Sequence, residues 1–154
     1  MLKADYRLIR LADTHFAEVK RLEQVSHSHP WSDANIMSAL SSDRLQVLGI
    51  FDQRNALAAY AVFDCIVDEL TLQNIAVAKH HRGQGLAKYL INHSWAVFPA
   101  AQTQFLEVRA SNTAAISLYQ VLGFCEVGIR ANYYPHKTGR EDAVIMALPR
   151  PMDN

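Results

Sequence analysis

The sequence has few cysteines and lacks the long apolar runs of membrane helices and signal peptides. It contains only two cysteines among 154 residues, Cys65 and Cys125, and each lies inside an apolar run. We expect both thiols to be buried, and their spacing does not suit a metal site. An apolar run of about 18 residues, the length that a membrane helix needs, is absent, and residues 1–7 lack the apolar core of a signal peptide. We therefore expect a cytosolic protein without a membrane span.

An excess of charge of either sign is also absent. The chain carries 15 basic and 15 acidic side chains, a balance that does not favour non-specific binding to nucleic acid or to a membrane surface. Hydrophobic residues make up 50% of the chain, which at this length is enough for one sizeable core. We therefore predict one domain over residues 1–148 and a short tail over 149–154, in a monomer or a weak oligomer.

Apolar periodicity and turn residues predict a mixed α/β domain, in which several antiparallel strands alternate with a few helices. The expected strands cover residues 6–11, 45–51, 56–67, 70–77, 103–108, 124–129 and 143–148, with a polar stretch over 130–142 between the last two. Asp13 and Ser32 are candidate N-terminal caps of the first two helices, and the buried face of the first extends to Val25. A later helix begins near Asn112 and ends at Gly123.

The most informative segment runs from Asn74 to Leu90. An apolar, β-prone run ends at a polar loop that contains Gly83 and Gly85, and a helical pattern starts immediately afterwards with Leu86. The first N–H groups of a helix have no partner inside the helix and carry a partial positive charge. Because glycine has no Cβ, a ligand can lie against the backbone of such a loop. The segment therefore predicts a phosphate-binding site.

Three kinds of phosphate-binding loop can be compared with this segment. A P-loop requires G-x-x-x-x-G-K-[ST], but Gly83 and Gly85 are too close and Lys88 is not followed by serine or threonine. A dinucleotide fingerprint requires three glycines, and Lys88 occupies the third glycine position, although Glu107 lies at a suitable distance for the acidic residue. The pattern [Q/R]-x-x-G-x-[G/A] is fully matched by the segment from Arg82 to Ala87. The alternative for the loop alone is a plain strand–turn–helix connection without a ligand.

A second motif, Tyr-x-x-x-Gly-Phe at residues 119–124, follows the loop after a further strand. In this order the two motifs resemble the GNAT family of N-acetyltransferases. Four further segments resemble its RimI-type subgroup, the bacterial ribosomal-protein alanine N-acetyltransferases, at residues 29–32, 74–77, 106–116 and 132–143. His80 and His81, just before the loop, depart from the subgroup, and we expect them at the exposed edge of the loop rather than in a metal pair.

The resemblance implies a mixed, mostly antiparallel sheet of about six to seven strands, splayed in the middle and flanked by about four helices. In that family acetyl-CoA lies between the two splayed strands as the cosubstrate, and the reaction needs no metal. By resemblance, the cofactor contacts are Ile75, Ala76, Val77, Arg82, Gly83, Gln84, Gly85, Leu86, Ala87 and Asn112. Asn112 also stands where a residue caps a helix, so it can serve either role or both.

Acetyl transfer from a thioester to an amine requires a base for the amine proton, a polarised carbonyl and a proton for the leaving thiolate. Glu107 is the candidate base because it interrupts an apolar strand, although alternation also permits a plain solvent-facing position there. Tyr119 is the candidate acid by resemblance, and the alternative is a packed aromatic side chain. The N–H of Val77 is the candidate that polarises the carbonyl. No motif gives either cysteine a partner base, so we expect direct transfer without a covalent intermediate.

The acceptor in the resembled subgroup is the N-terminal alanine of a ribosomal protein, the eighteenth of the small subunit. An α-amino group has a pKa near 8 and a lysine near 10.4, so a single carboxylate base deprotonates the α-amino group more easily. This favours an N-terminal amine without excluding the alternatives. These are transfer to a lysine, a polyamine or another small amine, and a non-catalytic regulator that binds acyl-CoA.

Aromatic and acidic side chains are the candidates for binding this acceptor. Trp31, Tyr133 and Tyr134 are candidate walls of the acceptor groove, and a core position is equally open for Trp31. Four acidic residues could attract a basic acceptor or simply be solvated, namely Asp68, Glu69, Glu141 and Asp142. We expect no direct contact with nucleic acid.

Overall fold

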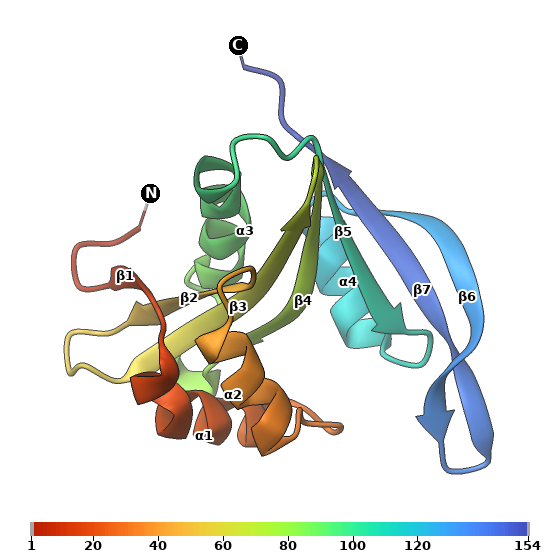
Figure 1. Ribbon diagram of the computed structural model, residues 1–154, viewed down its shortest axis with the longest axis horizontal. Helices are drawn as coiled ribbons and strands as arrows, with labels where there is room; N and C mark the ends of the chain where they lie inside the picture. Colours follow the sequence, from red (N-terminus) through yellow and green to blue (C-terminus); the bar gives the residue numbers. More distant parts are fainter. Residues whose placement is uncertain (1, 154) are drawn as a thin grey trace. The chain divides into compact units, whose positions relative to one another are not determined.

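The computed structural model describes residues 2–153 of the chain (Figure 1). The strands are β1 (Arg7–Arg10), β2 (Gln46–Phe51), β3 (Leu57–Ile66), β4 (Glu69–Val77), β5 (Thr103–Arg109), β6 (Cys125–His136) and β7 (Gly139–Pro149). The helices are the 3-10 turns η1 (Asp13–His15) and η2 (Lys79–His81) and the α-helices α1 (Phe16–Ser26), α2 (Asp33–Ser41), α3 (Leu86–Val97) and α4 (Thr113–Val121). Within residues 2–153 no helix is both long and apolar enough to cross a membrane.

The seven strands form one mixed sheet in the order β1-β2-β3-β4-β5-β7-β6. β4 pairs with β5 in parallel, whereas the pairs β1–β2, β2–β3, β5–β7 and β6–β7 are antiparallel. This architecture confirms the mixed and mostly antiparallel α/β sheet that the sequence predicts.

The chain divides into two compact units. The N-terminal unit contains the residues up to Cys65 together with Leu72–Pro99, and the C-terminal unit contains Ile66–Thr71 and the residues from Ala100 onward. β4 contributes to both units, because its first residues belong to the C-terminal unit and the others to the N-terminal unit. The single domain expected over residues 1–148 stays a prediction.

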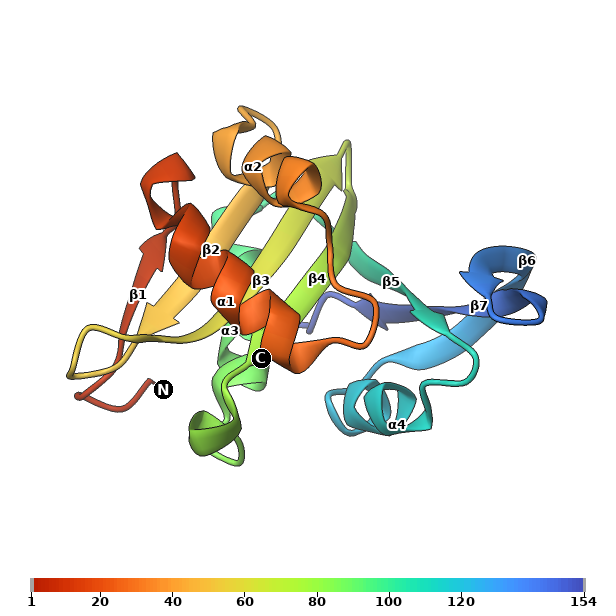
Figure 2. The same cartoon turned by 90° about the horizontal axis from the view of Figure 1, so that it is seen from below.

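In the N-terminal unit, α1 and α2 cover one face of strands β1–β4, and α3 lies behind them (Figure 2). The core under α1 and α2 consists of Leu11, Val19, Leu22, Ile36, Ala39, Leu40, Val47, Phe51, Tyr60, Val62 and Ala76. The predicted hairpin around residues 52–55 is present, and β2 pairs with β3 on either side of it. Ser32 caps α2 as predicted, because its Oγ accepts a hydrogen bond from the Asn35 N–H (3.1 Å).

In the C-terminal unit, β5 pairs on one side with the first residues of β4 and on the other side with β7 along its whole length. Asn112 caps α4, because its Oδ1 accepts a hydrogen bond from the Ala115 N–H (3.2 Å). Gly123 follows α4 with a φ of +103°, a conformation that glycine adopts without strain. Both predicted ends of this helix are therefore confirmed.

The last two strands are much longer than the sequence predicts. Residues 130–142 read as a polar connection, but β6 continues to His136 and β7 starts at Gly139, so most of this stretch is a hairpin. The prediction is wrong because β6 is an edge strand with mostly exposed residues, where polar side chains do not interrupt pairing.

This hairpin contains a bulge. Arg130 pairs with Ala143 and Tyr134 with Glu141, so that three residues of β6 lie opposite one residue of β7. Asn132 in the bulge has a φ of +53°, and its N–H donates a hydrogen bond to Oδ1 of Asp142 (2.9 Å). The Asp142 side chain therefore holds the extra residues in place.

Three smaller predictions are also wrong. Asp13 does not cap a helix with its side chain, because it begins η1, where the Ala12 N–H donates to Nδ1 of His15 (3.0 Å). Val25 is 76% exposed, since it lies in the last turn of α1 beyond the apolar core. Cys125 is exposed at the start of the edge strand β6, and Cys65 is only half-buried.

Candidate active site

The end of β4, the loop after it and the start of α3 contain nine of the ten residues predicted to contact the cofactor. Ile75 and Ala76 are buried in β4, and Val77 ends the strand with a half-buried side chain. Arg82 folds back onto the strand, where its Nε donates a hydrogen bond to the carbonyl oxygen of Val77 (3.2 Å). This contact fixes the start of the loop against the end of the strand.

The backbone of this loop is open. Gly83 and Gly85 have φ angles of +76° and +77°, and a Cβ at either position would meet no atom within 4 Å. Gly85 is the N-cap residue of α3, and no side-chain hydrogen bond caps this end of the helix in the described chain. The first-turn N–H groups therefore remain free to bind an anion. A phosphate group can therefore lie against this loop, and buried Leu86 anchors the helix behind it.

Glu107, the candidate base, lies on β5 in the C-terminal unit with a side chain that is 29% exposed. Its Oε1 lies 3.2 Å from Nη2 of Arg130 on the bulged strand β6. The Arg130 guanidinium also lies over the ring of Tyr133, 4.8 Å from the ring centroid. Arg130 therefore connects Glu107, the candidate base, with Tyr133, a candidate residue for binding the acceptor.

A second arginine, Arg109 on β5, stacks on the ring of Tyr134. The Arg109 guanidinium lies 4.6 Å from the centroid of the Tyr134 ring, which in turn contacts Tyr133 edge to face. Burial, together with the nearby carboxylate of Glu107, raises the pKa of Tyr134 to about 12. The two tyrosines and the two arginines thus form a stacked group beside Glu107.

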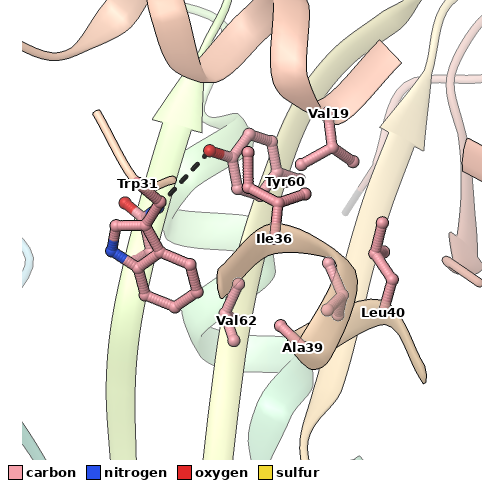
Figure 3. A pocket seen from close by; sticks show the side chains of 9 residues that line it. Val19, Trp31, Ile36, Ala39, Leu40, Tyr60 and Val62 are labelled. Carbon is pink, nitrogen blue, oxygen red and sulfur yellow. Dashed lines mark hydrogen bonds between the residues drawn. The ribbon is translucent and has the colours of Figure 1, made fainter. Parts of the chain in front are cut away.

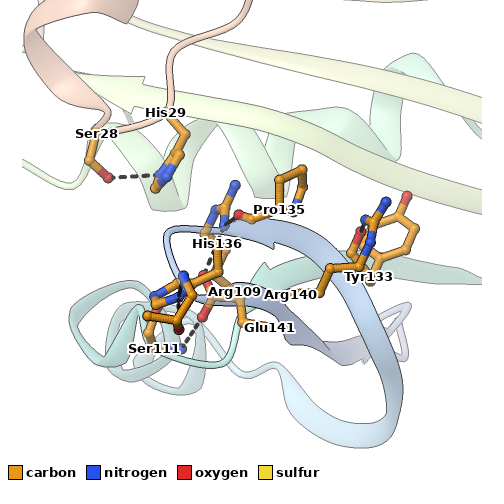
Figure 4. Close-up of polar contacts among 10 residues, drawn as sticks. Ser28, His29, Arg109, Ser111, Tyr133, Pro135, His136, Arg140 and Glu141 are labelled. Atoms are coloured by element: carbon orange, nitrogen blue, oxygen red, sulfur yellow. Dashed lines mark hydrogen bonds and ion pairs between the residues drawn. The ribbon is translucent and has the colours of Figure 1, made fainter.

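Arg109 also fixes the far end of the β6–β7 hairpin (Figure 4). Its Nη1 donates to Oε1 of Glu141 and to the carbonyl oxygen of Pro135, each at 2.8 Å. The second carboxylate oxygen of Glu141 accepts from the Ser111 N–H (3.3 Å), and the Arg109 hydrogen bond holds the pKa of Glu141 at about 2. Glu141 therefore bonds to Arg109 and Ser111, and Asp142 bonds within the hairpin, whereas Asp68 and Glu69 are exposed.

Tyr119, the candidate acid, is half-buried on α4 in the same unit. Its ring meets Phe124 edge to face, with centroids 5.9 Å apart. Burial is the main cause that raises the pKa of Tyr119 to about 12, and the charge of Tyr134 adds to it. The phenol is therefore protonated at neutral pH.

A buried acidic residue that the sequence did not reveal lies in the N-terminal unit. Glu23 on α1 is fully buried, and its carboxylate accepts hydrogen bonds from the Trp31 N–H (2.8 Å), from Nδ2 of Asn74 (2.9 Å) and from the Tyr60 hydroxyl. Nε2 of His27 lies 3.2 Å from the same carboxylate. We call these five residues the Glu23 cluster. Tyr60 and Asn74 are distant from Glu23 in sequence, so no local pattern predicts these contacts.

The structure places Trp31 partly in the core, and its role as a wall of the acceptor groove stays a prediction. Its side chain is partly buried against the core below α1 and α2, and it borders a narrow apolar cavity there (Figure 3). It also borders a larger pocket of about 240 Å³, together with Asn35, Ser38, Ala39, Leu45 and Gln73.

Among residues 2–153 no three His, Cys, Asp or Glu side chains are arranged to hold a metal ion.

Comparison with known proteins decides the family. A model of the acetyltransferase (GNAT) family matches residues 12–124, which is well over half of the chain. The chain belongs to the GNAT acetyltransferase family. GNAT acetyltransferases use acetyl-CoA, so the open loop between β4 and α3 belongs to an acetyl-CoA-dependent enzyme.

Curated GNAT relatives resemble the chain over nearly its whole length. It is 43% identical over 141 residues to the [ribosomal protein bS18]-alanine N-acetyltransferase of Escherichia coli strain K12, covering 90% of this chain and 94% of the relative. A protein of the same name from Haemophilus ducreyi is 36% identical, covering 90% of this chain and 96% of that protein.

Solved GNAT structures give the same result. The crystal structure of the ribosomal-protein-S18-alanine N-acetyltransferase from Escherichia coli matches with a TM-score of 0.82 and 40% identity, covering 97% of this chain and 96% of that one. Arabidopsis thaliana NAA60 in complex with a bisubstrate analogue matches with a TM-score of 0.83 at 13% identity, covering 95% of this chain and 99% of that one. The second likeness shows the shared GNAT fold alone.

Proposed function

We propose that this GNAT acetyltransferase moves the acetyl group of acetyl-CoA to the N-terminal alanine of a ribosomal protein. The observation that carries the proposal is its 43% identity, over 90% of the chain, to the Escherichia coli enzyme named for that reaction. We infer that the reaction takes place in the cytoplasm, where bacterial ribosomal proteins are synthesised.

The N-terminal unit supplies most of the cofactor contacts in this proposal. The backbone of Ile75–Val77 pairs with the pantetheine arm, and the loop from Arg82 to Ala87 holds the pyrophosphate at the start of α3. The positive φ angles and the open space at Gly83 and Gly85 support this role. Asn112 contributes from the C-terminal unit, since capping α4 occupies its Oδ1 and leaves its Nδ2 donors for the cofactor.

The chemical step uses Glu107 and Tyr119. The amine nitrogen attacks the thioester carbonyl carbon, and Glu107 accepts the proton that this nitrogen loses. The Val77 N–H stabilises the negative charge that develops on the carbonyl oxygen. The carbon–sulfur bond then breaks, and the leaving thiolate takes the hydroxyl proton of Tyr119. Arg130 lies 3.2 Å from Oε1 of Glu107, and we assign the role of base to the second carboxylate oxygen.

Trp31, Tyr133 and Tyr134 bind the acceptor in this proposal. The stacking of Arg130 and Arg109 on the two tyrosine rings supports it, because rings fixed in this way lose little conformational freedom when a peptide binds. A basic acceptor does not depend on Glu141, whose carboxylate is already bound by Arg109.

The proposal is tested with peptides that start with alanine and with matched peptides whose N-terminus is blocked and whose only amine is a lysine. We expect acetylation of the alanine peptides, and preference for the blocked peptides would contradict the proposed acceptor. Glu107→Gln and Tyr119→Phe should each lower kcat by about a hundredfold or more, the low end of the usual contribution of a general acid or base. Full kcat in both variants would refute the assigned roles. Mass spectrometry of ribosomal proteins from cells with and without the gene then identifies the natural acceptor.

A further inference from the structure

The two histidines before the glycine loop lie in different environments. His80 is exposed, whereas the side chain of His81 is only 23% exposed and bonds through both ring nitrogens. Nδ1 of His81 lies 2.8 Å from the hydroxyl of Tyr6, and Nε2 lies 3.1 Å from Oδ2 of Asp52. The expectation of an exposed edge is therefore correct for His80 and wrong for His81.

Asp52 is fixed by the turn that connects β2 and β3. Its Oδ1 accepts hydrogen bonds from the N–H groups of Arg54 (2.8 Å) and Ala56 (3.0 Å), which leaves Oδ2 for His81. These backbone hydrogen bonds, the one from Ala56 above all, hold the pKa of Asp52 below its ordinary value. Because a carboxylate oxygen only accepts, Nε2 of His81 donates to it, and Nδ1 forms the hydrogen bond with the Tyr6 hydroxyl.

The segment that carries Tyr6 reaches the loop at a second point. Nζ of Lys3 donates a hydrogen bond to Oε1 of Gln84 (2.7 Å), and a turn between Lys3 and Tyr6 joins the two contact points. Gln84 lies between the two open glycines, and His81 precedes Arg82 directly. The start of the chain and the β2–β3 turn thus hold the loop on both sides of Gly83.

We propose that His81 is a positioning residue for acetyl-CoA. Its hydrogen bonds to Tyr6 and Asp52 fix the start of the glycine loop, and we call these three residues the His81 clasp. The inference rests on the proposed role of this loop as the pyrophosphate site. Glycines in a loop permit many backbone conformations, so an unclasped loop loses more entropy when it binds pyrophosphate. The clasp keeps the loop in its binding conformation before the cofactor arrives.

Calorimetric titration with CoA alone tests the inference, since it requires no acceptor and therefore does not depend on which amine is acetylated. We expect His81→Ala to weaken CoA binding about five- to tenfold, the effect of losing roughly one net hydrogen bond. In peptide assays the KM for acetyl-CoA should rise, while the KM for the acceptor should stay unchanged. His80→Ala, the exposed neighbour, should bind CoA as the parent protein does.

Tyr6→Phe keeps the test informative if His81→Ala does not fold. This variant removes a single hydroxyl, and we expect it to weaken CoA binding about two- to threefold. Adding Tyr6→Phe to His81→Ala should have no further effect, because the hydroxyl acts through the histidine. Unchanged CoA binding in Tyr6→Phe and His81→Ala, or an equal rise in both KM values, would overturn the inference. Changed CoA binding without transfer to an alanine peptide would support the clasp and count against the proposed acceptor.

Discussion

Replacing Glu23 by alanine removes the central acceptor of the Glu23 cluster and leaves three hydrogen-bond donors, on Trp31, Tyr60 and Asn74, facing a cavity. Breaking a fully buried group of this kind costs about 3–5 kcal/mol of the free energy of unfolding. Glu23→Gln keeps one acceptor oxygen but turns an amide donor toward another donor, so we expect a smaller loss of about 1–3 kcal/mol. Small domains have only about 5–15 kcal/mol in total, so the alanine variant should be close to unfolding at 37 °C.

Urea unfolding, followed by tryptophan fluorescence and extrapolated linearly to water, measures these losses. Gln24→Ala is the matched control, because Gln24 is the exposed neighbour of Glu23 on α1 and its removal should change stability by at most about 0.5 kcal/mol. A loss of less than about 1 kcal/mol for Glu23→Ala would refute the reasoning, since the Glu23 carboxylate would then not be a buried acceptor on which the cluster depends.

Three further predictions concern single residues. Burial raises the pKa of Tyr119 to about 12, so its proton is lost only as the pH rises toward that value; a comparison with Tyr119→Phe should show no fall in kcat from its ionisation below about pH 10. The hydrogen bond from Arg109 lowers the pKa of Glu141 from 4.5 to about 2, so the stability that its carboxylate contributes is fully present above pH 4.5 and is lost as the pH falls toward 2. The Tm difference between the parent and Glu141→Gln should therefore be constant above pH 4.5 and shrink below it. Gly85→Ala places a Cβ in open space at a φ of +77°, so backbone strain alone should destabilise the variant by about 1–2 kcal/mol in urea unfolding.

Local signals in the sequence predict much of this fold. The caps at Ser32 and Asn112, the β2–β3 hairpin and the strand before the glycine loop depend on neighbouring residues, and all are confirmed. The β6–β7 hairpin was not predictable in the same way. Its polar residues pair because Arg109 binds Glu141 and Asp142 binds Asn132, contacts that span many residues.

In the candidate site, too, the features formed by neighbouring residues were predictable, and the features formed by distant residues were not. The glycine loop is one continuous segment of the sequence, and so is the motif around Tyr119. Together they indicated the family that the comparison with known proteins confirms. The Glu23 cluster and the His81 clasp escape such an analysis, because their partners come from other elements, 51 and 75 residues away at the farthest. The roles of Glu107 and Tyr119 stay predictions until the variants are measured.

The bulge in β6 has a consequence for how this enzyme can diverge. Residues 131–133 lie opposite the single residue Asp142, between two paired stretches of β6 and β7, so a length change there should leave the pairing on either side intact. Tyr133 belongs to this segment, and Arg130 and Tyr134 flank it. If these tyrosines bind the acceptor as proposed, insertions and deletions in the bulge would change acceptor choice without refolding the sheet.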